Sequence, residues 1–319
     1  MKIGIEYLSF FVPQFYIDLG TIAEQQDVAA EKYYNGIGQE KMSMPPHSED
    51  VVTLGANAAH SIIEKNGVDD IDTVIFCTET GIDQSKSAGI YVARLLGLKD
   101  NVRNVEMKQA CYSATAALQL ACGYVARKPN KKVLIIASDI SRYDLGSNAE
   151  SSQGCGAVAM LISSDAKILE VDPVSGLHSE DVMDFWRPNH RKTAIVDGKF
   201  SAQKYLQSMA HAWNDYQENG GRNFEEFAQF CYHLPFSKMG EKAHRHLSKI
   251  NSSPMAEKSY LPGMELNRVI GNSYSASLYI SLISALTRAE GDLSDKPIAL
   301  FSYGSGCVGE LLSGVVQPN

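Results

Sequence analysis

The sequence predicts an α/β protein of two similar halves, with layered helices covering mixed, mostly parallel sheets. Apolar, β-branched runs such as DTVIFCT at 72–78 and KVLIIAS at 132–138 alternate with helical segments. This alternation is typical of strands buried on both faces of a largely parallel sheet. The segment CYSATAALQLA at 111–121 has small side chains and no charge, so we expect a buried helix that begins with Cys111. Similar segments recur in the same order in both halves, which indicates a duplicated architecture.

In the first half, the segments alternate as this fold requires. We expect strands at 1–12, 72–78, 102–107, 132–138 and 154–163. Helices are expected at 19–34 with Asp18 as its cap, at 51–66 with caps in Ser48-Glu49-Asp50, in a stretch ending near 96, and from Cys111 onward.

The second half begins less regularly. Residues 172–200, including VMDFWRPNHRK, lack periodicity and are expected to be loop within an insertion at about 172–220. We then expect helices at 201–219 and 223–229, a strand at 230–236, helices at 238–247 and 273–289, and two strand-like runs within 298–316. We place the boundary between the halves at 165/166, giving units 1–165 and 166–319.

Composition narrows the class of protein. A net charge of −8 over 319 residues argues against nucleic acid as the main partner. Six cysteines without CxxC spacing exclude the common zinc frameworks and fit reduced thiols in a cytosol. The N-terminal apolar run is interrupted by Glu6 and lacks a small-residue cleavage site, so it is expected to be a strand and not a signal peptide. No uncharged apolar stretch approaches the length of a membrane span. We expect a cytoplasmic protein without a membrane anchor.

Four residue types with reactive side chains occupy corresponding places in the two halves. Glu79 follows a strand in TETGID, and His233 follows one in YHLPFSK. Cys111 and Asn272 each open a helix of small residues, and the closing strands GCGAVAMLISS and GSGCVGELLSG also match loosely. If a pseudo-two-fold axis relates the halves, the two helix starts meet and the four side chains converge on one pocket.

The chemistry of this set points to acyl thioesters. A thiol at a helix N-terminus has a lowered pKa, so Cys111 can attack a thioester and hold an acyl group. His233 can polarise a carbonyl, and Asn272 can donate to an oxyanion or orient the imidazole. Glu79 at the end of a buried strand is expected to have a raised pKa and to act as a general base on a weakly acidic α-proton. Together they indicate carbon–carbon bond formation on acyl thioesters.

Each residue alone is more often structural. A lone cysteine is usually a small buried hydrophobe, a lone histidine or glutamate a satisfied or solvated group, and an asparagine before a helix a cap. Lys238 and Lys242, one helical turn apart after the histidine, are usually a solvated face, although they could also meet the phosphates of coenzyme A. Only the combination favours catalysis.

Seven segments carry a resemblance to a known family, in family order over nearly the whole chain: CTETGID, EMKQACYSATAALQLA, ASDISRY, EDVMDFWRP, FCYHLPFSKMG, VIGNSYSASLY and LFSYGSGCVGE. The sequence resembles the bacterial-type 3-hydroxy-3-methylglutaryl-CoA (HMG-CoA) synthases of the thiolase superfamily. The resemblance implies the duplicated thiolase fold, a homodimer, and the reaction of acetyl-CoA, acetoacetyl-CoA and water to HMG-CoA and CoA in the mevalonate route to isoprenoids. It implies no metal or bound prosthetic group. Family members usually continue beyond the point where this chain stops.

The resemblance also implies roles for individual residues. Cys111 matches the acetylated nucleophile and Glu79 the general acid/base. His233 matches the residue that binds and activates acetoacetyl-CoA, with Asn272 as its supporting amide. The remaining matches are pocket or surrounding positions at Asp83, Asp139, Tyr143, Asp184 and Phe185, a glycine-turn wall at Ser302, Tyr303 and Gly304, and coenzyme A contacts at Lys238 and Lys242.

Three alternatives stay open at this point. ETGID and ACYSATA also resemble the branch that acts on carrier-protein-bound β-ketothioesters in polyketide β-branching, although DFWRP favours the primary-metabolic enzymes. A ketoacyl-synthase-III or thiolase relative would share the cysteine, histidine and asparagine, and Glu79 discriminates against it. A catalytically silent scaffold for other acyl-CoA enzymes would not need all four residues intact.

Overall fold

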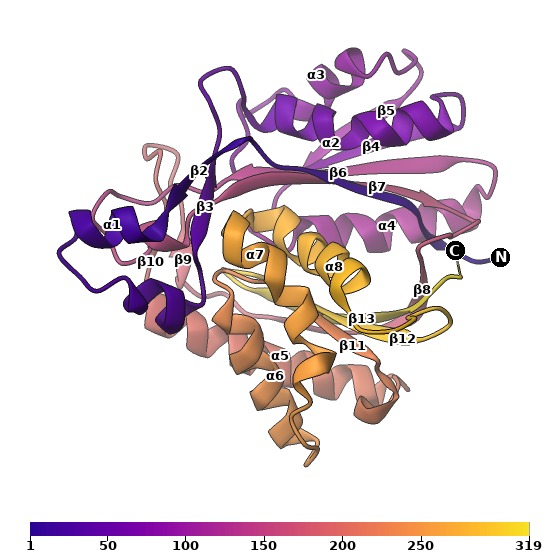
Figure 1. The fold of residues 1–319 in the computed structure, drawn as a ribbon. Coiled ribbons are helices and arrows are strands. Elements are labelled where there is room, and N and C mark those ends of the chain that lie inside the picture. Colours follow the sequence, from indigo (N-terminus) through magenta and orange to yellow (C-terminus); the bar gives the residue numbers. More distant parts are fainter. Residues whose placement is uncertain (319) are drawn as a thin grey trace.

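The structure is a computed structural model that describes residues 1–318, and it forms five layers (Figure 1). Two sheet layers enclose α4 and α8, α2 and α3 cover one outer face, and α5 and α6 cover the other. The first half contains β1 (Gly4–Phe11), β2 (Phe15–Asp18), α1 (Leu19–Gln25), β3 (Lys41–Met44), α2 (Val51–Asn66), β4 (Ile71–Cys77), α3 (Ala88–Leu95), β5 (Arg103–Met107), α4 (Ser113–Arg127), β6 (Lys132–Ile140) and β7 (Cys155–Ser163). The second contains β8 (Leu169–Ser179), β9 (Phe185–Trp186), β10 (Ile195–Val196), α5 (Gly198–Glu218), β11 (Gln229–Tyr232), α6 (Lys238–Ile250), α7 (Glu265–Ile270), α8 (Ser277–Arg288), β12 (Pro297–Gly304) and β13 (Val308–Val316).

The strand order shows the duplication directly. Within residues 1–318, the main sheet has the order β5-β4-β6-β7-β1-β8-β13-β12-β11. Reading outward from the β1–β8 junction, β7, β6 and β4 of the first half correspond to β13, β12 and β11 of the second. The pairings correspond as well: β4–β6 and β11–β12 are parallel, whereas β6–β7 and β12–β13 are antiparallel. The halves join through a short β1–β8 pairing at Gly4 and Ile5.

The α/β class and the mixed sheet between helices are confirmed. The strands that helical crossovers connect, such as β4 with β5 and β6, pair in parallel, as alternation of strands and helices predicts. Antiparallel pairs arise where β7 and β13 return beside the strands that precede them, and where β1 and β8 meet.

Apolar side chains between the layers form the core. One cluster lies around α4 and α8 and includes Leu118, Val125, Tyr279 and Leu282. A second lies beneath α2 and α3, and a third beneath α5 and α6. Helix α2 shows how local sequence fixes an element, because Asp50 forms a capping box with Thr53 at its first turn.

Three predicted elements are wrong. The helix expected at 19–34 ends at Gln25, because Asp27 takes a left-handed conformation with φ 50° and a separate π-helical turn follows at Lys32–Ile37. The loop expected from 172 is the main-sheet strand β8 up to Ser179, whose half-buried side chains lack a simple alternation. The helix expected at 223–229 is a single 3₁₀ turn that leads into β11.

The proposed correspondence of Cys111 with Asn272 is also wrong. Helices α4 and α8 begin at Ser113 and Ser277, so the residue two positions before the helix is Cys111 in one half and Ser275 in the other. The backbone agrees, since the residues just before these two, Ala110 and Tyr274, have φ of 43° and 47°. Asn272 therefore lies three residues before the counterpart of the cysteine.

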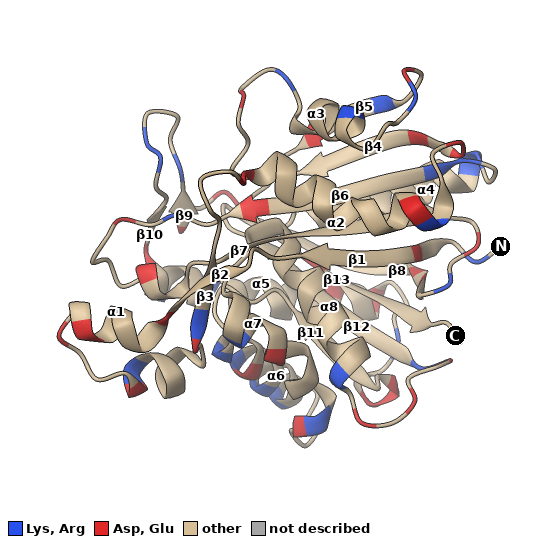
Figure 2. Cartoon of the chain, turned by 45° about the horizontal axis from the view of Figure 1, so that its top comes forward, with Lys and Arg blue, Asp and Glu red and all other residues tan. Residues whose placement is uncertain are grey.

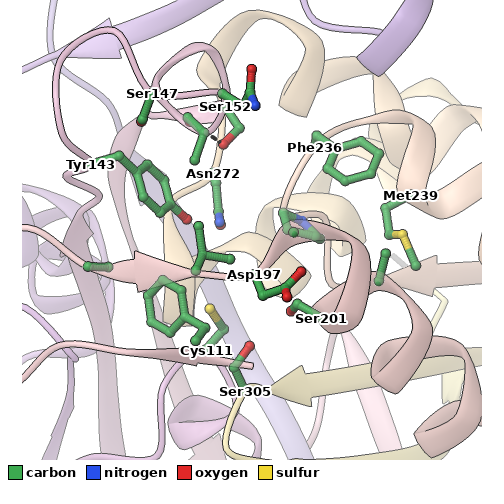
Figure 3. A pocket seen from close by; sticks show the side chains of 18 of the residues that line it. Cys111, Tyr143, Ser147, Ser152, Asp197, Ser201, Phe236, Met239, Asn272 and Ser305 are labelled. Atoms are coloured by element: carbon green, nitrogen blue, oxygen red, sulfur yellow. Dashed lines mark hydrogen bonds between the residues drawn. The ribbon is translucent and has the colours of Figure 1, made fainter. Parts of the chain in front are cut away.

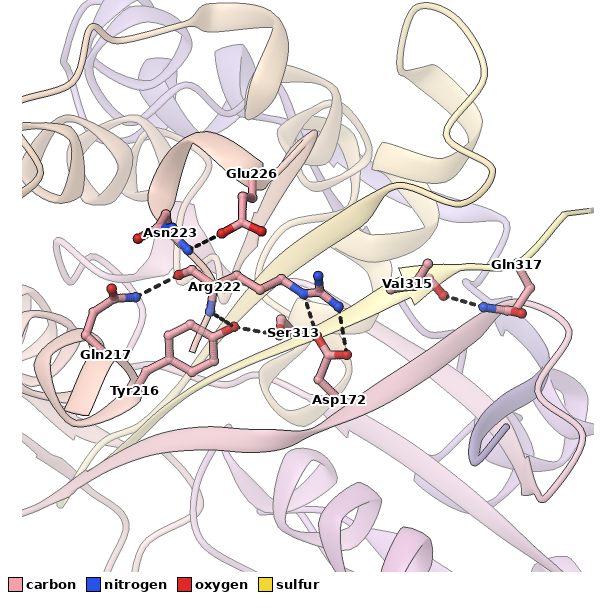
Figure 4. Close-up of polar contacts among 9 residues, drawn as sticks. All are labelled: Asp172, Tyr216, Gln217, Arg222, Asn223, Glu226, Ser313, Val315 and Gln317. Atoms are coloured by element: carbon pink, nitrogen blue, oxygen red, sulfur yellow. Dashed lines mark hydrogen bonds and ion pairs between the residues drawn. The ribbon is translucent and has the colours of Figure 1, made fainter. Parts of the chain in front are cut away.

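A polar network joins α5 to the second half's sheet (Figure 4). Asp172 on β8 accepts two hydrogen bonds from the Arg222 guanidinium and one from the Ser313 hydroxyl on β13. The Tyr216 hydroxyl on α5 lies 2.8 Å from the Ser313 hydroxyl and accepts from the Arg222 backbone N–H. These contacts hold the end of α5 against β8 and β13.

Candidate active site

The Cys111 thiol contacts the Glu79 carboxylate, as the sequence predicts. The Cys111 Sγ–H donates to Glu79 Oε1 at 3.2 Å, and the two residues are 9% and 8% exposed. Cys111 lies in the tight turn before α4, and Glu79 lies two residues beyond the end of β4. A nucleophile and a carboxylate therefore share a site that is nearly closed to water.

Asp139 at the end of β6 holds the Glu79 loop. One of its oxygens accepts from the hydroxyls of Thr78 and Thr80 and from the backbone N–H groups of Glu79 and Thr80. The other accepts from the backbone N–H and hydroxyl of Ser275, in the second half of the chain. One buried carboxylate thus binds the loop carrying Glu79 to the start of α8.

Burial controls the ionisation of both reactive groups. Burial, and then the nearby Asp139 carboxylate, raise the pKa of Glu79 to about 8. Burial and the adjacent Glu79 raise the pKa of the Cys111 thiol well above its ordinary value. The prediction that the helix N-terminus lowers the cysteine pKa is therefore wrong, because lost hydration and a neighbouring carboxylate outweigh the helix terminus.

His233 enters the same site from the second half. It follows β11, and its backbone N–H donates to the Phe301 carbonyl on β12 while its own carbonyl accepts from the Tyr205 hydroxyl. Burial lowers the pKa of His233 to about 3, so its imidazole is neutral near neutral pH. The Nδ1 atom is buried without a hydrogen-bond partner among residues 1–318. An unpartnered, neutral ring nitrogen is suited to interact with a bound carbonyl.

The cavity above the thiol has a volume of about 770 Å³. Cys111 and Asn272 point into it from opposite sides, with Tyr143 between them at one wall (Figure 3). Side chains from the loop after β6, from the hairpin β9–β10 and from α5 complete the lining. Tyr143, Phe185 and Tyr274 meet edge to face above Cys111 and make this end of the cavity apolar.

The structure brings part of the predicted set to the cavity. Its lining includes Cys111, Tyr143, Phe185, His233, Asn272 and Tyr303. Glu79 reaches it through the thiol, and Asp139 lies behind Glu79. Asp184 does not line the cavity, since its oxygens accept from Ser201, Tyr303 and the Gly306 N–H.

Other predicted positions lie further out. Asp83 is exposed and accepts from the backbone N–H groups of Ser85 and Lys86 in its own turn, so the structure does not bring it to the cavity. Ser302 is fully buried and does not line the cavity. Gly304 backs onto the nucleophile turn, where a β-carbon would lie 2.4 Å from the Gln109 carbonyl.

Lys238 and Lys242 lie on α6, where basic residues gather on the surface (Figure 2). Lys242 Nζ lies 5.1 Å from the centre of the Phe236 ring, and Phe236 lines the cavity. Lys238 packs against Gly38, next to the cavity residue Ile37. Both cations therefore flank the cavity without lining it.

Several cavity residues escaped the sequence analysis. Tyr205 and Lys199 on α5 carry no motif, and only the fold brings this helix to the site. Tyr274 lies in the segment VIGNSYSASLY, but an alignment of Asn272 with Cys111 conceals that Tyr274 corresponds to Ala110, the residue before the cysteine. Comparing the two helix starts residue by residue could have found Tyr274.

The duplicated fold and a buried cysteine beside a carboxylate and a neutral histidine define a cysteine-dependent, thiolase-type acyltransferase. Comparison with known proteins narrows this class. The family profile "Hydroxymethylglutaryl-coenzyme A synthase N terminal" matches residues 1–167, and the C-terminal profile matches 169–251 and 245–319. The chain belongs to the hydroxymethylglutaryl-CoA synthase family.

Individual proteins of this family are also similar to the chain in sequence and structure. The chain is 43% identical to hydroxymethylglutaryl-CoA synthase of Enterococcus faecalis, over 98% of this chain and 83% of that protein. It is 35% identical to the polyketide biosynthesis 3-hydroxy-3-methylglutaryl-ACP synthase PksG of Bacillus subtilis, over 99% of this chain and 80% of that protein. A crystal structure of HMG-CoA synthase complexed with CoA superposes with a TM-score of 0.95 at 37% identity, covering 99% of this chain and 83% of that one. These matches confirm the expected family and its activity, the condensation of acetyl-CoA with acetoacetyl-CoA.

Two further findings concern the described residues. No helix among them is long and apolar enough to cross a membrane. No group of three or more histidine, cysteine or acidic side chains within 1–318 is arranged to hold a metal ion.

Proposed function

We propose that the chain makes HMG-CoA in three stages, with Cys111 as the nucleophile. The Cys111 sulfur attacks the carbonyl of acetyl-CoA, and coenzyme A leaves with the thiol proton, giving an acetyl thioester on the enzyme. The Glu79 carboxylate then takes a proton from the acetyl methyl group, and the resulting carbanion attacks the ketone of acetoacetyl-CoA beside His233. The new alkoxide takes up a proton, and water cleaves the thioester to free the product and Cys111.

The observation that carries this proposal is the 3.2 Å contact between Cys111 Sγ and Glu79 Oε1 beside a cavity that also contains His233. A base next to the sulfur lies next to the methyl group of an acetyl thioester formed there. His233 is neutral and has an unpartnered nitrogen, so it can hold the acceptor without first losing a proton. Asn272 adds an amide at the opposite wall (Figure 3).

The test separates acetylation from condensation. Wild type incubated with acetyl-CoA should gain one acetyl group on Cys111 in the intact mass spectrum. Glu79→Ala should still be acetylated but lose condensation by roughly 10²–10⁴-fold, the usual contribution of a positioned acid–base group. An active Glu79→Ala enzyme would remove Glu79 from the mechanism, and a wild type that gains no acetyl group would favour a scaffold.

For the acceptor, we propose the coenzyme A ester, with Lys238 and Lys242 meeting its phosphates. Both cations flank the cavity, and the higher identity is to a relative named for the CoA substrate. The alternative acceptor is a carrier-protein ester, since PksG is also similar. Offering both esters in parallel and following the loss of each decides between them. Consumption of malonyl-carrier protein would instead favour a ketoacyl-synthase-III-like enzyme.

We also propose that the chain acts as a homodimer through the edge at β5. This strand ends the sheet, and a row of exposed apolar side chains crosses α3, β5 and α4: Ile90, Tyr91, Leu95, Val105 and Leu120. Leu120 is 62% exposed although its helix carries no charge from Cys111 to Tyr124, a pattern that favours a covering partner. Light scattering should give twice the chain mass, and Leu120→Glu should shift it toward the monomer.

We make three further proposals, on the compartment, the cofactor requirement and the two halves of the chain. The cytoplasm is the compartment that fits six cysteines without a disulfide among the described residues. The chemistry set out above requires no metal or prosthetic group. The halves 1–165 and 166–319 are supported as units by the mirrored strand order around the β1–β8 junction.

A further inference from the structure

The hairpin β9–β10 forms a strap across the two halves at the thiol; we use the name for residues 184–197. Its first residue is fixed to the second half, because Asp184 accepts from the Ser201 hydroxyl at 2.8 Å, the Tyr303 hydroxyl at 2.9 Å and the Gly306 N–H at 2.8 Å. Asp184 has no exposed surface. The start of the strap is therefore held by three hydrogen bonds.

Three residues later the strap reaches the first half. Arg187 Nη2 donates to the backbone carbonyl of Glu79, 108 residues earlier in the chain. Between these two attachments, Phe185 packs against Tyr143 and Tyr274 above the cysteine. The strap thus covers the thiol and binds the backbone of its neighbouring carboxylate.

Arg187 does not line the cavity, so it is not placed to hold a substrate. Its guanidinium instead opposes the effects that disfavour a charged Glu79. Burial and the Asp139 carboxylate raise the pKa of Glu79, while Arg187 and the hydrogen bond from Cys111 lower it. Burial, and to a lesser extent the nearby Glu79 charge, raise the pKa of the Tyr143 and Tyr274 hydroxyls.

We propose that Arg187 is a positioning residue that fixes the Glu79 backbone against the nucleophile turn and favours the ionised carboxylate during condensation. This rests on the proposed role of Glu79 as the base. The bond to the carbonyl sets where the loop lies, and the charge acts on the carboxylate through space. The two contributions can be separated, because lysine keeps the charge but loses the planar donor fork of arginine.

The experiment compares Arg187→Met and Arg187→Lys with wild type. Lys192→Met is the matched control, since Lys192 is exposed in the same strap and does not line the cavity. Acetylation of Cys111 by acetyl-CoA and condensation of the acetyl-enzyme with acetoacetyl-CoA are measured separately from pH 6 to 9.5. Thermal unfolding of each variant reports whether it is folded.

Arg187→Met should acetylate Cys111 at close to the wild-type rate, but its condensation should rise only at higher pH. A midpoint one unit higher would lower condensation at pH 7 by about tenfold. Arg187→Lys should keep the midpoint within a few tenths of a unit and lose maximal rate, and Lys192→Met should match wild type.

An unmoved midpoint in a folded Arg187→Met enzyme would overturn the inference, as would loss of folding in both Arg187 variants, which would indicate a purely structural role. Failure of the proposed function looks different, because Glu79→Ala would then condense at close to the wild-type rate.

Discussion

The raised pKa of Glu79 predicts that the condensation step depends steeply on pH. The carboxylate must be ionised to take the methyl proton, so the step requires the form that predominates above the pKa of about 8. At pH 7 about one tenth of the enzyme has an ionised Glu79, and at pH 9 about nine tenths. The rate of condensation should therefore rise at least about tenfold between pH 7 and pH 9.

Acetylation of the cysteine moves this midpoint in a known direction. The hydrogen bond from the Cys111 thiol is one of the interactions that lower the pKa of Glu79, and the acetyl thioester has no proton to donate. The midpoint in the acetyl-enzyme should therefore lie at or above 8. His233, with a pKa of about 3, stays neutral over this range. It should therefore add no second pH-dependent change to the rate of condensation.

The assay uses acetyl-enzyme prepared with acetyl-CoA, freed of excess reagent and mixed rapidly with acetoacetyl-CoA from pH 6 to 9.5. Quenched samples give the rate of product formation on the enzyme in a single turnover. Glu79→Gln, which cannot ionise, serves as the control and should be slow and nearly independent of pH. A flat wild-type profile, or a midpoint below 6, would refute the reasoning that burial and Asp139 hold this carboxyl protonated.

Three other changes test separate parts of the structure. His233→Ala should spare acetylation but slow condensation by roughly 10²–10⁴-fold, and loss of acetylation as well would show a role in the first stage; both steps are measured by mass spectrometry. Gly304→Ala places a β-carbon 2.4 Å from the Gln109 carbonyl, so it should displace the turn that carries Cys111 and slow acetylation more than tenfold. An unchanged acetylation rate would show that the turn can move aside without displacing Cys111. Arg222→Ala removes two hydrogen bonds to the partly buried Asp172 and should lower the free energy of unfolding by about 1 kcal/mol with little effect on acetylation; denaturant unfolding measures this, and an unchanged midpoint would contradict it.

The sequence predicted the parts of the fold that local patterns specify. Buried strands such as β4 and β6 are continuous apolar runs, and Asp50 marks the start of α2 by its cap. Strand β8 was missed because its partners on both sides come from distant segments, and its burial follows from those partners and not from its own alternation.

For the site, the sequence predicted that four reactive side chains converge on one pocket. The structure places Glu79 against the Cys111 thiol, and Cys111, His233 and Asn272 line the cavity. The sequence predicted the wrong direction for the cysteine pKa, because desolvation depends on what the rest of the chain packs above the thiol. It likewise could not show that Arg187 reaches Glu79, since a contact between segments 108 residues apart is decided by tertiary packing.

The two corresponding helix starts are chemically unequal. Ser275 occupies the place where a second sulfur would stand, and its hydroxyl is engaged by Asp139 and so has no freedom to react. The helix start of the first half therefore performs the chemistry, while the corresponding helix start of the second half braces it. Separately expressed halves would therefore each be inert, and mixing them could restore turnover only if that brace re-formed.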